Sequence, residues 1–337
     1  MSGPSASVVL CTYNGAAYLR EQLASLARQS RLPAELVVGD DGSTDATLAI
    51  LERFAATAPF PVHVVCNERN LGYRANFVRT AGRASADLLF FCDQDDIWKD
   101  DKVERVTAAF APADVLLVYH NAVLVGPEGC SMLARLFDPL RQRALLSQSP
   151  MPPWHYTLGF TQAFRRELLA YDNLWPSSLD HMADKVMAHD QWFMFLALAL
   201  GRVEFLDADL VAHRQHGDNA YGVVRASPWR RLLSRFSHQP EWDCLAATAA
   251  TRRAEVLGEL ARRSSGDRLG QAEAMYRELA RQHARRLASY TLPAFRSRLR
   301  AFGEGLAARD YRSKPQGLGR AALPRDFVAG VLALSRR

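Results

Sequence analysis

Three carboxylates close together in the sequence are the residues best suited to chemistry. Asp93, Asp95 and Asp96 follow residues 88–92, an uninterrupted apolar run that is typical of a buried strand. Like charges this close are unfavourable unless they face water or hold a cation. Oxygen ligands suit Mg²⁺ or Mn²⁺, ions that commonly bridge to substrate phosphates. The alternative is a solvated turn in which Asp96 caps the next helix.

The chain before these acids alternates between strand and helix patterns. Strands are predicted at residues 7–12, 35–39, 62–66 and 88–92, and helices at 19–26, from 45 and at 73–84. Apolar strands that alternate with helices indicate an α/β fold with a mostly parallel central sheet flanked by helices. Such sheets bind ligands beyond the carboxyl ends of their strands, where four polar turns fall, at residues 12–15, 40–43, 67–72 and 93–96.

The rest of the chain changes character near residue 221. Before that point, strands are predicted at 115–119, 122–125 and 203–206, an extended segment at 154–164 and a helix at 182–200. Residues 1–224 carry 19 Lys and Arg against 26 Asp and Glu, a net charge of −7, whereas residues 225–337 carry 23 against 10, a net charge of +13. We therefore predict an α/β domain over 1–224 and a basic α-helical region over 225–337.

Composition excludes several classes of protein. Hydrophobic residues make up 48% of the 337 and charged residues 23%, which is ordinary for a globular protein. No segment has the roughly 18 uncharged apolar residues needed to span a bilayer, and the N-terminus lacks the pattern of a secretion signal. The five cysteines show no CxxC spacing. We expect reduced thiols and a cytoplasmic protein.

Four segments carry a resemblance to a known family. They are SVVLCTYNGAAYLREQLASLARQS, ELVVGDDGSTDATLAIL, NERNLGYRANF and FFCDQDDIW. Together they resemble family 2 glycosyltransferases over about the first 220 residues, which implies the A-type glycosyltransferase fold. With the later HDQW and RQHGDN, the chain is most similar to bacterial rhamnosyltransferase-type enzymes of surface polysaccharide assembly.

The resemblance implies a donor site for a nucleotide-diphosphate sugar at the four turns. Its binding residues are Thr12, Tyr13, Asn14, Asp40, Asp41, Asn70 and Asp93. An ionised carboxylate only accepts hydrogen bonds, so Asp40 or Asp41 can receive a base N–H; the alternative for this segment is turn and cap chemistry. Asp93 is expected near the ribose, and Asp95 is expected to bind a divalent metal, Mn²⁺ or Mg²⁺, that bridges the two phosphates.

Two later segments complete the expected site. The resemblance assigns Asp190 as the general base that removes the acceptor's hydroxyl proton, whereas the alternative is a helix-terminal charge favoured by the dipole. His216 is expected to complete the metal shell and Arg214 to pair with phosphate oxygens. Gly159 and Trp192 are expected beside the acceptor.

The basic tail has two interpretations besides solvated helix faces. Residues 228–236 have aromatic residues and Leu on one side and Arg on the other, which is typical of a membrane-surface helix. Docking on the inner face of the cell membrane would suit a lipid-linked acceptor. Self-association into a homo-oligomer through the same helices is equally compatible with the pattern. The charge also fits nucleic acid, but no motif supports that partner.

These observations predict an inverting, metal-dependent glycosyltransferase. The expected donor is dTDP-rhamnose, with a UDP-sugar as the alternative nucleotide, and the expected acceptor is a lipid-linked surface saccharide. One alternative is a sugar-1-phosphate nucleotidylyltransferase, although the first strand lacks its Gly-rich, Arg-containing loop. The other is a non-catalytic nucleotide-sugar-binding scaffold, which would not need Asp93, Asp95, Asp190 or His216.

Overall fold

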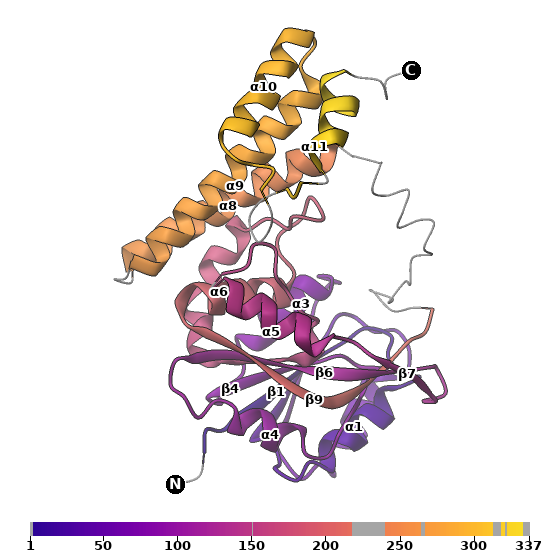
Figure 1. The fold of residues 1–337 in the computed structure, drawn as a ribbon. Helices are drawn as coiled ribbons and strands as arrows, with labels where there is room; N and C mark the ends of the chain where they lie inside the picture. The colour runs from indigo at the N-terminus through magenta and orange to yellow at the C-terminus, as the bar shows by residue number, and fades with distance from the viewer. Residues whose placement is uncertain are drawn as a thin grey trace. The chain divides into compact units, whose positions relative to one another are not determined.

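The computed structural model describes residues 3–149, 151–217, 240–263, 267–312, 318–320 and 322–332. They belong to two compact units (Figure 1). The sheet unit comprises Met1–Pro150, His155–Trp175 and Met187–Val223, and the helical unit comprises Met151–Trp154, Pro176–Val186 and Val224–Arg337. The boundary predicted after residue 224 lies outside the described residues. No sequence pattern indicated that two short earlier segments belong with the helices.

The sheet unit is built on one mixed sheet with the strand order β3-β2-β1-β4-β8-β6-β9-β5, and β7 pairs with β6. The strands are β1 (Ala6–Thr12), β2 (Glu35–Asp40), β3 (Val62–Cys66), β4 (Leu88–Cys92), β5 (Ile97–Trp98), β6 (Val115–Val125), β7 (Ser131–Arg135), β8 (Gln162–Arg165) and β9 (Arg202–Arg214). The first four strands are parallel, as predicted. β8 lies antiparallel between β4 and β6, so the whole sheet is less parallel than the sequence indicated.

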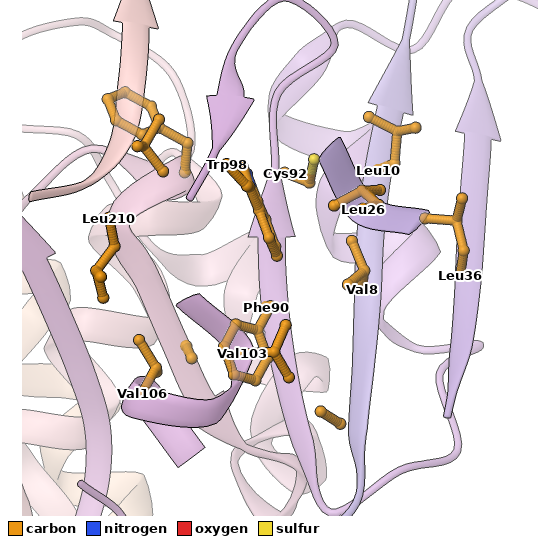
Figure 2. Packing of buried hydrophobic residues seen from close by; sticks show 14 of the residues in the cluster. Val8, Leu10, Leu26, Leu36, Phe90, Cys92, Trp98, Val103, Val106 and Leu210 are labelled. Atoms are coloured by element: carbon orange, nitrogen blue, oxygen red, sulfur yellow. The ribbon is translucent and has the colours of Figure 1, made fainter. Parts of the chain in front are cut away.

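Helices cover both faces of this sheet. They are α1 (Leu19–Ala27), α2 (Thr47–Ala55), α3 (Tyr73–Ala81), α4 (Lys102–Ala108), α5 (Pro139–Gln148) and α6 (His189–Leu200), with 3-10 turns at Gly159–Thr161 and Arg166–Ser177. Figure 2 shows Val8 and Phe90 of the strands packed with Val103 of α4. Each large apolar side chain buried in this way contributes roughly 1.5–3 kcal/mol. The packing fixes the carboxyl ends of the strands, where the site lies.

Helix α6 is shorter than its sequence pattern. Apolar periodicity predicted a helix over 182–200, but the helix begins at His189. The Asp180 carboxylate accepts the Met182 N–H at 2.9 Å and forms a turn there, and Ala188 is extended. The first turn of α6 therefore carries Asp190.

The helical unit contains α8 (Pro240–Arg263), α9 (Asp267–Thr291), α10 (Phe295–Ala307), α11 (Ala322–Arg325) and a π-helical turn at Asp326–Val331. Two of the arginines read as solvated from the sequence, Arg253 and Arg286, are buried. Arg286 forms an ion pair with buried Asp326 at 2.7 Å. Buried ion pairs of this kind need hydrogen-bonded partners. The periodicity of the sequence does not show which arginines have such partners.

Within the described ranges, no helix combines the length and apolar character needed to cross a bilayer. Residues 228–236, predicted as a membrane-surface helix, lie outside the described residues.

Candidate functional site

The acidic cluster lies directly beyond the end of β4. Asp93, Asp95 and Asp96 each place an oxygen within 4.8 Å of the others. Loss of hydration, and then the charges of Asp96 and Asp95, raise the pKa of Asp93 well above its usual range. Asp96 is fully buried, and its Oδ2 has no hydrogen-bond partner. Carboxylates under this repulsion fit a divalent cation, so the residues present match the expected metal.

His216 reaches this cluster from the end of β9. Its Nε2 lies 2.8 Å from Oδ2 of Asp95, across 121 positions of sequence. The His216 ring also packs on Tyr18, with 4.8 Å between ring centroids. Two expected metal ligands are therefore adjacent, and carboxylate oxygen with imidazole nitrogen suits Mn²⁺.

Asp96 organises the strand beneath the cluster. Its Oδ1 accepts the backbone N–H of Arg214 at 3.1 Å and lies 2.8 Å from Nδ1 of His213. Burial disfavours a charged imidazole, but the hydrogen bond to Asp96 and the nearby carboxylates raise the pKa of His213. The prediction that Asp96 caps the next helix is wrong, because α4 begins at Lys102 and its N-cap is Asp101.

Arg214, predicted to pair with phosphate oxygens, is held by groups of the protein. Its side chain is only 3% exposed and forms an ion pair with Glu21. The guanidinium also donates to the backbone carbonyls of Pro127 and Asp95, and it lies 4.8 Å from the Tyr18 ring. Protein acceptors therefore surround this guanidinium, and Arg214 holds the backbone of Asp95.

The turn after β1 is tied to the acidic cluster through Gln94. The Gln94 amide accepts the Tyr13 N–H at 2.9 Å and donates to the Tyr13 carbonyl at 3.1 Å. A Cβ at Gly15 would lie 2.3 Å from Gln94 Oε1, so only glycine leaves room for this pairing. The Tyr13 side chain remains half exposed, as a nucleoside-edging residue requires. Asn14 takes a positive φ of 49°, and its Oδ1 accepts the Thr44 N–H at 2.9 Å.

The two carboxylates after β2 are engaged by the protein itself. Asp40 accepts from the Thr12 hydroxyl at 2.8 Å and from the Ser43 N–H at 2.9 Å. Asp41 accepts from the backbone N–H groups of Leu71 and Gly72, both at 2.8 Å. Both acids are buried. This geometry matches the turn alternative. A hydrogen bond from a base N–H to either carboxylate stays a prediction.

Asp41 thereby orders the segment that contains Asn70. The Asn70 side chain is exposed, and its Oδ1 accepts the Gly72 N–H at 3.0 Å. Gly72 has a φ of +78°, which glycine adopts without strain. Of the polar residues at this edge, Tyr13, Asn14 and Asn70 are the exposed ones predicted to meet the nucleotide.

Asp190 lies in the first turn of α6 and is 9% exposed. Its charge contributes to the raised pKa of Asp93, so the base candidate lies within the electrostatic field of the acidic cluster. The backbone carbonyl of Asp190 accepts a hydrogen bond from Gln162 Nε2 at 3.2 Å. The position satisfies both interpretations of Asp190, general base and helix-terminal charge.

Gly159 and Trp192, the two residues predicted beside the acceptor, lie in different surroundings. A Cβ at Gly159 would lie 2.4 Å from Nε2 of His189, so the turn packs closely against the residue before Asp190. The His189 ring stacks on Phe77 at 3.9 Å. Trp192 is completely buried, as are most residues of α6. A contact between Trp192 and the acceptor stays a prediction.

Sequence reasoning missed Lys102. Its side chain is buried, and Nζ donates to the Phe160 carbonyl at 2.8 Å. The signal was present in the helix pattern: the buried positions of α4 are Lys102, Val103, Val106 and Thr107. A lysine at this spacing occupies a core-facing position.

The chain is similar to known proteins in sequence and in fold. Residues 7–171 match the family model described as Glycosyl transferase family 2. The chain contains a family 2 glycosyltransferase domain. An uncharacterized glycosyltransferase of Nostoc sp. is 26% identical over 219 residues, 63% of this chain and 65% of that protein. The dTDP-rhamnosyl transferase RfbG of Shigella flexneri is 25% identical over 220 residues, 64% of this chain and 74% of its own length.

Solved structures share the fold of this family 2 protein. Residues 1–349 of S. aureus TarS in complex with UDP-GlcNAc superpose with a TM-score of 0.52 at 19% identity. The superposition covers 98% of this chain and 92% of the TarS chain. The predicted A-type glycosyltransferase fold is confirmed. The chain matches less than two thirds of the length of the Nostoc relative.

Proposed function

We propose that this protein is an inverting, divalent-metal-dependent glycosyltransferase that transfers a sugar from a nucleotide-diphosphate donor to a saccharide hydroxyl. The observation that carries the proposal is the carboxylate cluster of Asp93, Asp95 and Asp96 with His216 at 2.8 Å from Asp95. The family 2 domain supports the reaction class. A nucleotide-binding scaffold would gain nothing from carboxylates held under mutual repulsion.

The proposed chemistry follows from the placement of the acids. Asp95 and His216 would hold Mn²⁺ or Mg²⁺, which supplies positive charge to the departing diphosphate. Asp190 takes the proton of the acceptor hydroxyl. The hydroxyl oxygen then bonds to the anomeric carbon from the face opposite the diphosphate, while the bond from that carbon to the diphosphate oxygen breaks. Attack from the opposite face inverts the anomeric configuration.

The donor proposed first is dTDP-rhamnose. Its support is the similarity to the S. flexneri protein named as a dTDP-rhamnosyl transferase. A UDP-sugar is the second candidate, because the TarS structures with the same fold hold UDP and UDP-GlcNAc. The acceptor is proposed to be a saccharide of a surface polysaccharide. The family match argues against the nucleotidylyltransferase alternative.

Calorimetry with a panel of nucleotide diphosphates tests this proposal. The wild-type protein is titrated with dTDP, UDP and GDP in the presence of Mn²⁺, Mg²⁺ or a chelator, beside Asp95→Ala. We expect one nucleotide to bind only with metal, and the variant to lose that binding. Unchanged affinity in the variant would remove Asp95 from the site. Absence of binding by wild type under every condition would favour the scaffold.

We also propose that the helical unit docks on an anionic lipid surface. Phe295, Leu299 and Leu306 of α10 are 48%, 41% and 44% exposed, and their spacing puts them on one helix face. Arg296 and Arg300 flank this apolar strip and are exposed. The region from residue 225 onward carries a net charge of +13. Apolar and basic residues together match an anionic membrane interface.

Vesicle co-sedimentation tests the docking surface. Phe295→Ser with Leu299→Ser should reduce binding to vesicles of phosphatidylglycerol and phosphatidylcholine, whereas Leu32→Ser, an exposed leucine of the sheet unit, should not. Equal binding by all variants would overturn the proposal. A smaller solution mass of the double variant by light scattering would instead assign the strip to self-association.

A further inference from the structure

One buried cation lies beside the acidic cluster without a carboxylate as its hydrogen-bond partner. Lys102 is 1% exposed, although lysine is almost never fully buried unless it is paired. Its Nζ donates to the Phe160 carbonyl at 2.8 Å and lies 3.4 Å from the centroid of the Trp98 ring. Both partners are uncharged, so they do not by themselves account for a buried ammonium group.

The acidic cluster supplies the missing negative charge. Burial lowers the pKa of Lys102 to about 7, while the charges of Asp96 and Asp93 oppose that shift. The Asp96 Oδ2 atom is buried without a hydrogen-bond partner. Charges in a poorly hydrated region act on one another over several ångströms. Lys102 therefore offsets part of the charge of the cluster from the protein side.

The same side chain holds the turn that leads to Asp190. The Phe160 ring stacks on His213 with 4.3 Å between centroids, and His213 Nδ1 lies 2.8 Å from Asp96. Two residues further along, Gln162 donates to the backbone carbonyl of Asp190. The Phe160 turn, Gly159–Thr161, thus has three contacts around the site. The Phe160 ring contacts His213, the Phe160 carbonyl accepts from Lys102, and Gln162, which follows the turn, donates to the carbonyl of Asp190.

We propose that Lys102 is a positioning residue that moderates the affinity of the carboxylate cluster for a divalent cation and holds the Phe160 turn for the acceptor. This inference rests on the proposed function. Its two parts predict opposite changes. Loss of the ammonium charge leaves the cluster more negative, so the cation binds more tightly. Loss of the hydrogen bond releases the Phe160 turn, so the acceptor is used less well.

The test compares three substitutions of Lys102 with one control. Lys102→Met removes charge and hydrogen bond at similar length, Lys102→Gln removes the charge but keeps an N–H donor, and Lys102→Arg keeps the charge. Lys99→Met removes an exposed charge three positions away. Mn²⁺ alone is titrated by calorimetry at about pH 6, below the lowered pKa of Lys102, so that its side chain carries the charge. The melting temperature is recorded, and KM for the donor and for the acceptor are measured.

We expect Lys102→Met and Lys102→Gln to bind Mn²⁺ roughly tenfold more tightly. Lys102→Arg and Lys99→Met should keep the affinity of the wild type. Lys102→Met should raise KM for the acceptor severalfold and leave KM for the donor within about twofold. Lys102→Gln should raise the acceptor KM less than Lys102→Met, because its amide can still donate to Phe160.

Unchanged or weaker Mn²⁺ binding by both neutral variants would overturn the proposal. Failure of both variants to fold would also overturn it, because Lys102 would then be a requirement of the fold alone. A different result would contradict the proposed function: the wild type itself would then neither bind a nucleotide with metal nor transfer a sugar.

Discussion

The surroundings of the site carboxylates Asp93 and Asp95 disfavour their charged forms. Burial and the charge of Asp96 raise the pKa of Asp95, and the hydrogen bond from His216 only partly opposes this. The pKa of Asp93 is raised more strongly. Groups with perturbed pKa values concentrate at functional sites, where ligand binding recovers the cost. The cluster is thus an arrangement of repelling carboxylates that a bound cation would stabilise.

Asp93→Asn should stabilise the metal-free protein at neutral pH. The folded-state pKa of Asp93 lies above its unfolded value, so its carboxyl group favours the folded state at low pH. That contribution is lost as pH rises from about 4 through the raised folded pKa. Removing the charge should raise the melting temperature at pH 7.5 by about 2 °C or more and have little effect at pH 4.

Calorimetric scans at both pH values, with chelator present, check this expectation. Asp87→Asn is the matched control, because hydrogen bonds from Ser5 lower the pKa of Asp87. That control should lose stability at pH 7.5. A melting temperature of Asp93→Asn that falls at neutral pH would contradict the assigned repulsion.

Asp190→Asn should separate donor binding from transfer. The amide keeps the shape of the side chain but cannot take a proton, and general-base catalysis typically contributes 10²–10⁴-fold. We expect kcat to fall by about 100-fold or more and the affinity for the nucleotide donor, measured by calorimetry, to stay within about twofold. A fully active variant would leave Asp190 as a helix-terminal charge only.

At the scale of elements, the strand ends form a preorganised rim. Gln94 joins the loop after β4 to the turn after β1 through two hydrogen bonds with Tyr13. Asp41, after β2, organises Leu71 and Gly72 through their backbone N–H groups. Each of these links joins two loops that are distant in sequence. The exposed residues proposed to face the donor therefore lie on loops held by buried polar groups. This limits the conformational entropy that these loops lose when a ligand binds.

Gly15→Ala should uncouple two of these loops. The new Cβ would displace the Gln94 amide, which lies at 2.3 Å from that position and belongs to a flexible side chain. Loss of its two hydrogen bonds to Tyr13 should cost roughly 1–2 kcal/mol of stability. Gln94→Ala should cost a similar amount, and the double variant should cost no more than either alone.

Urea denaturation of the four proteins measures that coupling. Metal-dependent nucleotide affinity, measured in parallel, should fall together in all three variants because Tyr13 belongs to the proposed donor site. Fully additive losses in stability would show that Gly15 and Gln94 act independently and would contradict the assigned contact.

At the scale of the whole molecule, two short segments of the α/β region of the sequence belong to the helical unit. Trp154, with a φ of 64°, stacks on His181 at 4.7 Å between ring centroids. The guanidinium of buried Arg253 lies 4.7 Å from the Trp154 ring and donates to the Tyr276 hydroxyl at 3.2 Å. In sequence, Trp154 precedes Gly159 and His181 precedes Asp190. The helical unit therefore holds the segments that lead into the expected acceptor side.

Arg253→Met should destabilise the helical unit. It removes a cation packed on two aromatic rings and leaves the Tyr276 hydroxyl without this donor, a loss of roughly 1–2 kcal/mol. We expect a melting temperature lower by about 3–6 °C in a thermal scan. Arg252→Met is the matched control, since its side chain is 54% exposed and pairs with Glu255. Equal effects of both variants would contradict the assignment.

The sequence alone determined the first four strands and the acidic residues that follow them. Apolar runs that alternate with helical periodicity placed β1 to β4, and therefore the four turns at their carboxyl ends. The pairing of Asp95 with His216 was expected from motif resemblance and is present at 2.8 Å. The strands and turns are local features, because strand and turn propensities depend on neighbouring residues.

Tertiary structure alone decided how the polar groups are used. Asp40, Asp41 and Arg214 were predicted as ligand groups, but the protein itself supplies their partners. Lys102 is buried with its Nζ donating to the carbonyl of position 160 and lying over the Trp98 ring. A buried polar group must find a partner, and that partner can lie anywhere along the chain. Spacing in the sequence reports the residue type at a strand end, but only packing decides which acceptors remain open to a substrate.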